Sequence, residues 1–403
     1  MKKREGSQLE FILLMAALMS IVALSIDAVL PALPQIGEHL SITDRVDNQK
    51  LITLIFLGLG IGQLIFGPLS DSFGRKPIVY LGFLIFIVAS IICLTTKSFE
   101  MMLLGRILQG VGLACPRTMT IAMIRDIYNG DYMAKIISIV VMVFILVPVI
   151  APTLGQFLMN AYNWQSIFGV TLAFGVIVML WFWFRQPETL KPKFKITYRL
   201  SLYATGTVAF FKIKPTVIFT LLSGFITGSF MVYLSSSQQI FENQYGLGKE
   251  FPYIFASLAI SVGFATFLNS RLVLKYGMMK LVHIAMLGYV LTSILYIVLY
   301  ANQPNPSVVV LVSFFAVQFF CIGFLFGNLR ALAMEPMGHI AGIGSALNGF
   351  ISTVMAVPIA DFIGSFVQDS VIPLFIGFSV CGIISLVLFY GQAPYFKSVF
   401  KTS

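Results

Sequence analysis

Asp27 is the residue whose type and position point most directly to chemistry. It lies in an apolar run from Phe11 to Leu33 that contains no other charge. A lone carboxyl group in hydrocarbon is costly, so an ionisable residue within a membrane segment indicates a functional site. Such a carboxyl can take up and release a proton. The run therefore predicts a proton-coupled membrane transporter, with Asp27 as the proton carrier.

Arg106 is the expected modulator of Asp27. The first span would end near Leu33 and the fourth would begin near Met101 on the same side of the membrane. At 1.5 Å per residue, Asp27 would lie about 9 Å and Arg106 about 8 Å from that surface. A guanidinium at that depth would keep Asp27 ionised, and separation of the two during transport would favour protonation. A static structural ion pair is the alternative interpretation.

Arg117 follows Arg106 by 11 residues, which is about three helical turns. The two arginines would share one face of a helix, with Arg117 about 16 Å deeper. A cation at that depth needs a cavity or a partner, which makes Arg117 a candidate ligand for an anionic or carbonyl-rich substrate. Alternatively, its side chain extends to the membrane surface.

The elements that must position these residues are membrane helices. The 403-residue chain is 58% hydrophobic and only 10% charged, with a mean hydropathy of +0.93. About 20 mostly apolar residues span a bilayer, which excludes a soluble enzyme. We expect twelve spans, at 10–33, 49–70, 78–96, 101–124, 134–159, 165–185, 215–241, 251–274, 279–301, 307–333, 341–366 and 371–391.

Basic residues predict the orientation of these spans. Only Arg45, Lys50, Lys97 and Lys249 would lie on the side opposite the N-terminus, whereas every other basic residue except Arg106 and Arg117 would lie on the N-terminal side. Cytoplasmic loops are enriched in Lys and Arg, so both termini are expected in the cytoplasm. The distribution also accounts for the net charge of +10 without nucleic acid as a partner.

The longest polar stretch, 186–214, divides the chain into halves. We expect an N-terminal six-helix bundle at 1–186, a cytoplasmic linker at 187–214 and a C-terminal six-helix bundle at 215–403. Segment 196–211 can form an amphipathic interfacial helix, or it is a plain linker. Six-plus-six repeats around a central loop are typical of one large class of transporters.

The segment from Gly67 to Pro77, which reads GPLSDSFGRKP, resembles the signature loop of the major facilitator superfamily. Gly74 permits a tight turn, and Asp71 can accept a hydrogen bond from Arg75. The resemblance implies that Gly67, Asp71, Gly74 and Arg75 act in the conformational switch rather than as substrate ligands. The stretch from Gly105 to Gly112 resembles a second motif, whose arginine is implicated in proton transfer.

Two further segments narrow the resemblance. Val147–Gln156 is similar to the family's Gly-Pro-rich antiporter motif, which assigns Pro152 and Gly155 to the switch and favours export. The segments 25–34, 125–128 and 331–342 are similar to the Bcr/CflA group of bicyclomycin-resistance-like drug exporters. This resemblance implies an all-α inner-membrane protein of twelve transmembrane helices in two pseudo-symmetric bundles.

Helices one, four, seven and ten line the central cavity in that superfamily, which implies a set of cavity candidates. They are Ser20, Asp27, Arg117, Tyr233, Gln238, Gln318 and Asn328. We expect a monomeric drug:proton antiporter that works by alternating access. A dedicated exporter of a metabolite such as a siderophore, a proton-coupled importer and a non-transporting receptor are the alternatives.

No catalytic group, cofactor or metal site is indicated. Cys93, Cys115, Cys321 and Cys381 lie in apolar runs at spacings that match no ligand motif, so we expect small buried side chains. Asp361 falls near the end of the eleventh run, where an interfacial position is favoured over a second proton site. The substrate, the proton stoichiometry and the conformational state are not determined by the sequence.

Overall fold

The computed structural model describes residues 7–42, 45–128, 130–195 and 200–391, and long α-helices dominate this part of the chain. Its helices fall into two compact units. Unit 1 comprises Met1–Leu200 and Lys249–Ala256, and unit 2 comprises Ser201–Gly248 and Ser257–Ser403. Residues 196–199 of the expected interfacial segment lie outside the described part.

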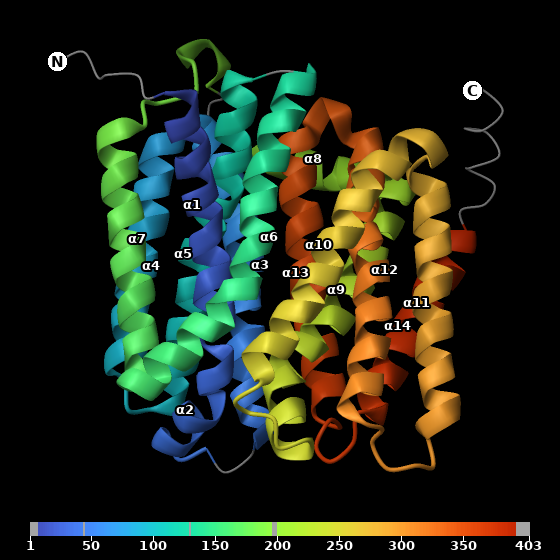
Figure 1. Cartoon of the computed structure of the whole chain (residues 1–403). Coiled ribbons are helices and arrows are strands. Elements are labelled where there is room, and N and C mark those ends of the chain that lie inside the picture. The colour runs from blue at the N-terminus through green and yellow to red at the C-terminus, as the bar shows by residue number, and fades with distance from the viewer. Residues whose placement is uncertain (1–6, 43–44, 129, 196–199, 392–403) are drawn as a thin grey trace. The chain divides into compact units, whose positions relative to one another are not determined.

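The long helices of unit 1 run roughly parallel or antiparallel to one another (Figure 1). They are α1 (Gln8–Asp27), α3 (Arg45–Phe73), α4 (Arg75–Thr95), α5 (Phe99–Ile127), α6 (Gly130–Ala161) and α7 (Gln165–Arg185). The short elements are η1 (Leu30–Ala32), α2 (Leu33–His39) and η2 (Pro192–Phe194). Helix α5 packs against both α3 and α4, and α1 packs against α6.

Side-chain caps and prolines fix the helix ends around the candidate site. The Ser7 hydroxyl accepts a hydrogen bond from the Glu10 amide at the start of α1, and the Ser98 hydroxyl accepts one from the Met101 amide at the start of α5. Such caps satisfy amides that have no partner within the helix. Helix α1 ends at Asp27, and Pro31 lies in the 3-10 turn η1 that follows. Asp27 therefore occupies the last turn of a helix.

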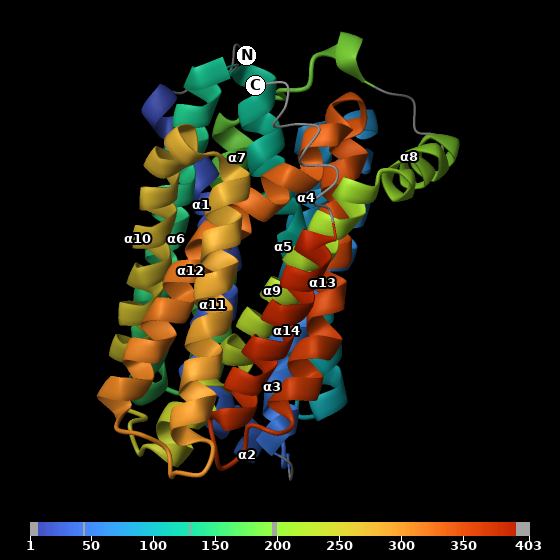
Figure 2. The same ribbon diagram turned by 90° about the vertical axis from the view of Figure 1, so that its right-hand side faces the viewer.

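Unit 2 consists of further long helices and one short helix that lies across them (Figure 2). Its elements are α8 (Leu200–Lys212), α9 (Lys214–Gln239), the π-helical turn η3 (Ile240–Gln244), α10 (Phe251–Tyr276), α11 (Met278–Tyr300), α12 (Val308–Met334), η4 (Glu335–Ile340), α13 (Ala341–Gly364) and α14 (Ile372–Tyr390). The first residues of α10, up to Ala256, are grouped with unit 1. Helix α9 packs against α12, α13 and α14, so it forms the centre of the unit.

Within the described residues, eleven helices are long and apolar enough to cross a membrane. They correspond to eleven of the twelve expected spans. The remaining expected span, 134–159, falls within α6, of which Leu146–Ala161 counts as a shorter apolar helix. The protein is therefore a multi-pass membrane protein, and the full count of twelve remains a prediction.

The two units differ in the polar groups that they bury. The charged residues that are buried in the described part are Asp27, Arg75 and Arg106, all in unit 1. The buried polar side chains of unit 2 are hydroxyls and amides, such as Ser293, Gln318 and Asn348. The four cysteines are free and buried.

Candidate functional site

Asp27 is 5% exposed at the end of α1. Among the described residues, its carboxylate forms no ion pair and accepts no hydrogen bond. A buried carboxylate without such partners is costly when it is charged. The position of Asp27 therefore makes proton uptake the chemistry that this side chain is suited to perform.

Arg106 is fully buried and joins three helices of unit 1. Its Nε donates to the carbonyl oxygen of Leu51 in α3 at 2.8 Å, and its Nη1 donates to the carbonyl oxygen of Ser25 in α1 at 3.1 Å. Nη1 also donates to Oε1 of Gln109 at 2.7 Å, one turn further along α5. The guanidinium faces the Phe168 ring of α7 at 5.8 Å. Arg106 thus anchors the end of α1 that carries Asp27.

The expected direct interaction between Asp27 and Arg106 is absent from the described residues. Arg106 reaches α1 at the backbone of Ser25, two residues before Asp27, and not at the carboxylate. Its Nη2 and the Ser25 hydroxyl are buried without a protein partner in the described part. Residue counts predict similar depths for the two side chains along their helices. They do not predict the direction in which each side chain points around its helix axis, and the expected pairing depends on that direction.

Gly155 brings α6 against the chain directly after Asp27. A Cβ built on Gly155 would lie 1.9 Å from the carbonyl oxygen of Ala28. No side chain fits there unless one of the two helices moves. Pro152, one turn earlier in α6, is buried as well. Gly155 of the antiporter-like motif therefore makes the contact with the residue that follows Asp27, and Pro152 lies one turn away from it in α6.

A second polar cluster surrounds Arg75, at the end of unit 1 where α1 begins. The Arg75 Nη1 donates to Asp71 at 2.6 Å, as the sequence predicts, and also to the Ser70 hydroxyl. Its Nε donates to Asp126, at the end of α5, at 2.9 Å. The Ser70 hydroxyl in turn donates to the carbonyl oxygen of Gly67. Arg75 thereby connects the signature loop to a different helix through two carboxylates.

Glu188 closes this cluster from the chain that follows α7. Its two carboxylate oxygens accept hydrogen bonds from the backbone amides of Arg75 and Lys76, each at 3.0 Å. These amides open α4 and have no partner within the helix. Gly74 has φ of 107° at this turn, and a Cβ there would lie 2.7 Å from the Glu188 carboxylate. The positive φ favours glycine at this position, whereas the end of the Glu188 side chain could shift to admit a Cβ.

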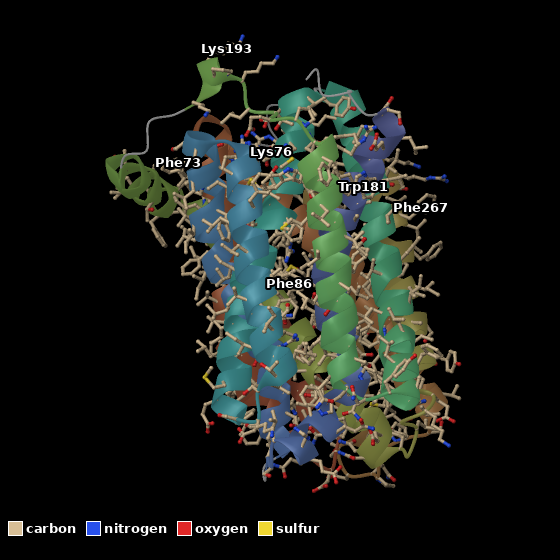
Figure 3. The ribbon with its side chains drawn as sticks, turned by 90° about the vertical axis from the view of Figure 1, so that its left-hand side faces the viewer. Phe73, Lys76, Phe86, Trp181, Lys193 and Phe267 are labelled. Atoms are coloured by element: carbon tan, nitrogen blue, oxygen red, sulfur yellow. The ribbon has the colours of Figure 1, made fainter. Side chains whose placement is uncertain are left out.

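The start of α1 is tied to α7 at the same end of unit 1. Glu10 accepts two hydrogen bonds from the Arg185 guanidinium and one from the Trp181 indole. Lys76, at the start of α4, donates to the carbonyl oxygen of Trp183. Figure 3 shows Lys76 and Trp181 at this end of the unit. Three helices are therefore joined here by polar contacts.

The remaining candidates of unit 1 are half-buried. Ser20 lies seven residues before Asp27 and thus on the same face of α1. Its hydroxyl donates to the carbonyl oxygen of Ala16 at 2.8 Å. Arg117 follows Pro116 within α5. Both side chains retain some exposure, which is compatible with the predicted place in a cavity.

The candidates of unit 2 form separate polar contacts. Gln318 is fully buried and donates to the Ser293 hydroxyl of α11. The amides of Asn328 and Asn269 donate to each other, at 2.7 and 3.3 Å, and connect α12 with α10. Gln238 donates to Glu242, on the π-helical turn η3. Each predicted ligand thus has a role in holding its helix.

Tyr233 lies in an aromatic cluster between α9 and α12. Its ring centroid is 4.6 Å from that of Phe319 and 5.1 Å from that of Phe315. Phe230 adds an edge-on contact with Phe319 at 5.3 Å and another with Phe326 at 5.5 Å. Such contacts are favourable beyond the burial of the rings. The cluster packs α9 against α12 through buried aromatic rings.

Several residues of the site were not predicted. Gln109 follows Arg106 by one turn, a spacing at which side chains of a helix meet. Glu188 is the single acidic residue between Arg185 and Lys214, in an otherwise basic stretch. Both were therefore detectable as sequence signals. Within the described residues, no cluster of His, Cys, Asp and Glu is suited to hold a metal ion.

Residues 14–360 match the family model described as Major Facilitator Superfamily. The chain is 26% identical to a bicyclomycin resistance protein homolog of Haemophilus influenzae, over 96% of this chain and 97% of that protein. It is 25% identical to the multidrug resistance protein MdtL of Citrobacter koseri, over 96% and 97%.

Solved structures with a similar fold include the D-xylose-proton symporter, with a TM-score of 0.77 at 14% identity, covering 95% of this chain and 97% of that one. Another is the human organic anion transporter MFSD10, with a TM-score of 0.68 at 14% identity, covering 96% and 99%. At these identities the likeness concerns the fold alone.

Proposed function

Because this chain belongs to the Major Facilitator Superfamily, we propose that it is a proton-coupled antiporter. It exports small molecules such as drugs across the inner membrane while protons move inward. Transport follows alternating access around a site near the middle of the membrane. Twelve spans, cytoplasmic termini, two six-helix bundles and a monomeric state belong to this proposal.

The observation that carries the proposal is the isolation of Asp27. A buried carboxyl without a cation or a hydrogen-bond donor in the described residues is neutral at low cost and charged at high cost. Contact with water on the proton-rich side would load it, and a conformational change would release the proton on the other side. Uptake and release of a proton at Asp27 are thereby coupled to the conformational change.

Arg106 and Gly155 couple this carboxyl to the helices around it. Arg106 holds the backbone of α1 two residues before Asp27, and Gly155 packs against the residue after it. A shift of α1 relative to α5 or α6 would alter both contacts. Any change in the environment of Asp27 is thereby linked to helix movement, and the cluster around Asp71 and Arg75 is the switch that stabilises one of the two states.

Export of drugs is supported by relatives along nearly the whole chain. One is named as a bicyclomycin resistance homolog and another as a multidrug resistance protein. The antiporter-like motif around Pro152 and Gly155 supports export as well. We therefore assign bicyclomycin-like and other uncharged antibiotics as the first substrates to examine.

The test uses inverted membrane vesicles with an acidic interior and radiolabelled bicyclomycin as the probe. The natural protein should accumulate the probe, and Asp27→Asn should lower the proton-driven initial rate by about a hundredfold or more. Asp369→Asn, the same change at an exposed loop residue, serves as the control. Full proton-driven uptake by Asp27→Asn, at equal amounts of folded protein, would disprove the role of Asp27. Uptake only by right-side-out vesicles would make the protein an importer.

A further inference from the structure

Helix α8 has an apolar stripe that no part of its own unit covers. The helix extends from Leu200 to Lys212, which is about 20 Å at 1.5 Å per residue. That length is too short to cross the hydrocarbon core of a bilayer, which is about 30 Å thick. Figure 2 shows α8 lying across the direction of α9 and α13. The helix is therefore placed as a surface element of unit 2.

One face of α8 is docked on the protein. Phe210 is fully buried, and Gly206, one turn earlier, lies against the side chain of Ile343 in α13. A Cβ built on Gly206 would lie 2.8 Å from Cδ1 of Ile343, so the helix approaches α13 closely. These contacts hold α8 in one orientation and so determine which of its residues point outward.

The outward face is apolar where a helix in water would be polar. Ala204, Val208 and Phe211 are exposed, at positions i, i+4 and i+7, which share one face of a helix. Val208 is 53% and Phe211 56% exposed. A helix that is apolar both on its docked face and on its outward face needs an apolar environment on the second side as well.

Charge indicates what that environment is. The stretch that contains α8 has no acidic residue from Lys191 to Lys214, and its basic residues are Lys191, Lys193, Lys195, Arg199, Lys212 and Lys214. Basic segments beside an amphipathic helix are attracted to anionic lipid headgroups, while the apolar stripe inserts at the boundary of the acyl chains. A soluble protein partner would not account for both features in a chain whose described part also has eleven helices that are long and apolar enough to cross a membrane.

We propose that α8 is an anionic-lipid-binding helix, with Val208 and Phe211 inserted in the leaflet and Lys212 and Lys214 at the phospholipid headgroups. The inference does not depend on the proposed direction or substrate of transport. Ile213 is the single residue between α8 and α9, the central helix of unit 2. Lipid bound at α8 therefore restrains the start of α9 and makes the movement of this helix sensitive to the headgroup composition.

The first experiment measures insertion. In the full chain, Val208→Cys is labelled with an environment-sensitive fluorophore, because the native cysteines are buried. We expect blue-shifted emission and quenching by lipids with a nitroxide at the upper acyl chain, in vesicles of phosphatidylcholine with phosphatidylglycerol. Gln303→Cys, in an exposed loop, should remain unquenched. Water-like, unquenched emission at residue 208 would overturn the proposal.

The second experiment measures the role of charge. Fluorescence at residue 208 is titrated with phosphatidylglycerol in phosphatidylcholine vesicles. Lys212→Gln with Lys214→Gln should raise the phosphatidylglycerol needed for half-maximal change about tenfold. Lys275→Gln with Lys280→Gln, two lysines elsewhere in unit 2, should leave it near the natural value. If the change of Lys212 and Lys214 to Gln left the titration unaltered, the assignment to anionic lipid would be overturned. It would also be overturned if inorganic phosphate gave the same fluorescence change in vesicles of pure phosphatidylcholine.

Discussion

Unit 1 and unit 2 have helices of similar length but different polar interiors. Unit 1 buries Asp27, Arg75 and Arg106, and two of these, Asp27 and Arg106, lie away from the ends of helical segments that are long and apolar enough to cross a membrane. In the described part of unit 2, the buried polar groups are neutral, and aromatic rings fill the seam between α9 and α12. Among the described residues, buried charge thus lies in unit 1, and the buried aromatic seam lies in unit 2.

This difference separates two physical tasks. A buried charge responds to protons, because its free energy changes greatly when it is neutralised. Amide and hydroxyl pairs such as Gln318 with Ser293 respond little to pH, but they hold neighbouring helices together in the interior of the unit. Under the proposed function, unit 1 would therefore supply the energy coupling, and unit 2 the neutral, aromatic-rich half of the transporter.

Arg106→Gln should have the largest effect on this comparison. The change removes two buried hydrogen bonds, from the Arg106 guanidinium to the carbonyl oxygens of Leu51 and Ser25, at a cost of about 3 kcal/mol. We expect a marked fall in the thermal midpoint of the purified protein and loss of proton-driven transport. Arg271→Gln, an exposed arginine of unit 2, is the control. Equal effects of the two changes would remove the distinction between the units.

Gly155→Ala should rank second. A Cβ at this position would lie 1.9 Å from the Ala28 carbonyl oxygen, so α6 must move away from the segment that follows Asp27. Overpacking of this kind costs about 2 kcal/mol, and we expect slower proton-driven transport in vesicles. Gly169→Ala, in α7, meets no atom within 4 Å and should change neither stability nor rate. If Gly155→Ala changed neither the stability nor the transport rate, the close α1–α6 contact would not be needed for transport.

Gln318→Leu tests unit 2, whose buried polar groups are neutral in its described part. The change removes the hydrogen bond to Ser293 from the buried interior of unit 2, which costs about 1 kcal/mol for a hydrogen bond between membrane helices. We expect a modest fall in the thermal midpoint and an altered KM for bicyclomycin. The dependence of the transport rate on pH should keep its shape. A shifted pH profile would show that unit 2 takes part in proton coupling.

Glu188→Ala should have the smallest effect. It removes the carboxylate that accepts from the first amides of α4, and loss of a helix cap costs about 1 kcal/mol. The thermal midpoint should fall slightly, and Glu38→Ala, an exposed acid elsewhere in unit 1, should leave it unchanged. A fall in the thermal midpoint as large as that caused by Arg106→Gln would mean that the contact of Glu188 with α4 determines the stability of the whole of unit 1.

The sequence predicted elements better than contacts. Hydropathy located the long helices, because twenty apolar residues in a row have one stable arrangement in a bilayer. The Asp71–Arg75 pair was predictable as well, since its residues are four positions apart. The partners of Arg106 were not, because they lie 55 and 81 residues away. Glu188 and the Arg75 amide are separated by 113 residues.

The sequence by itself determined a membrane protein of this superfamily, with a lone carboxyl in its first span and a motif loop beside its second. Composition and short motifs suffice for this, because the bilayer enforces helices and a tight loop needs particular residues locally. Only the tertiary structure decided that Arg106 binds the backbone near Asp27 and not its carboxylate. Rotation of helices about their axes is set by side-chain packing between distant segments, which no local pattern records.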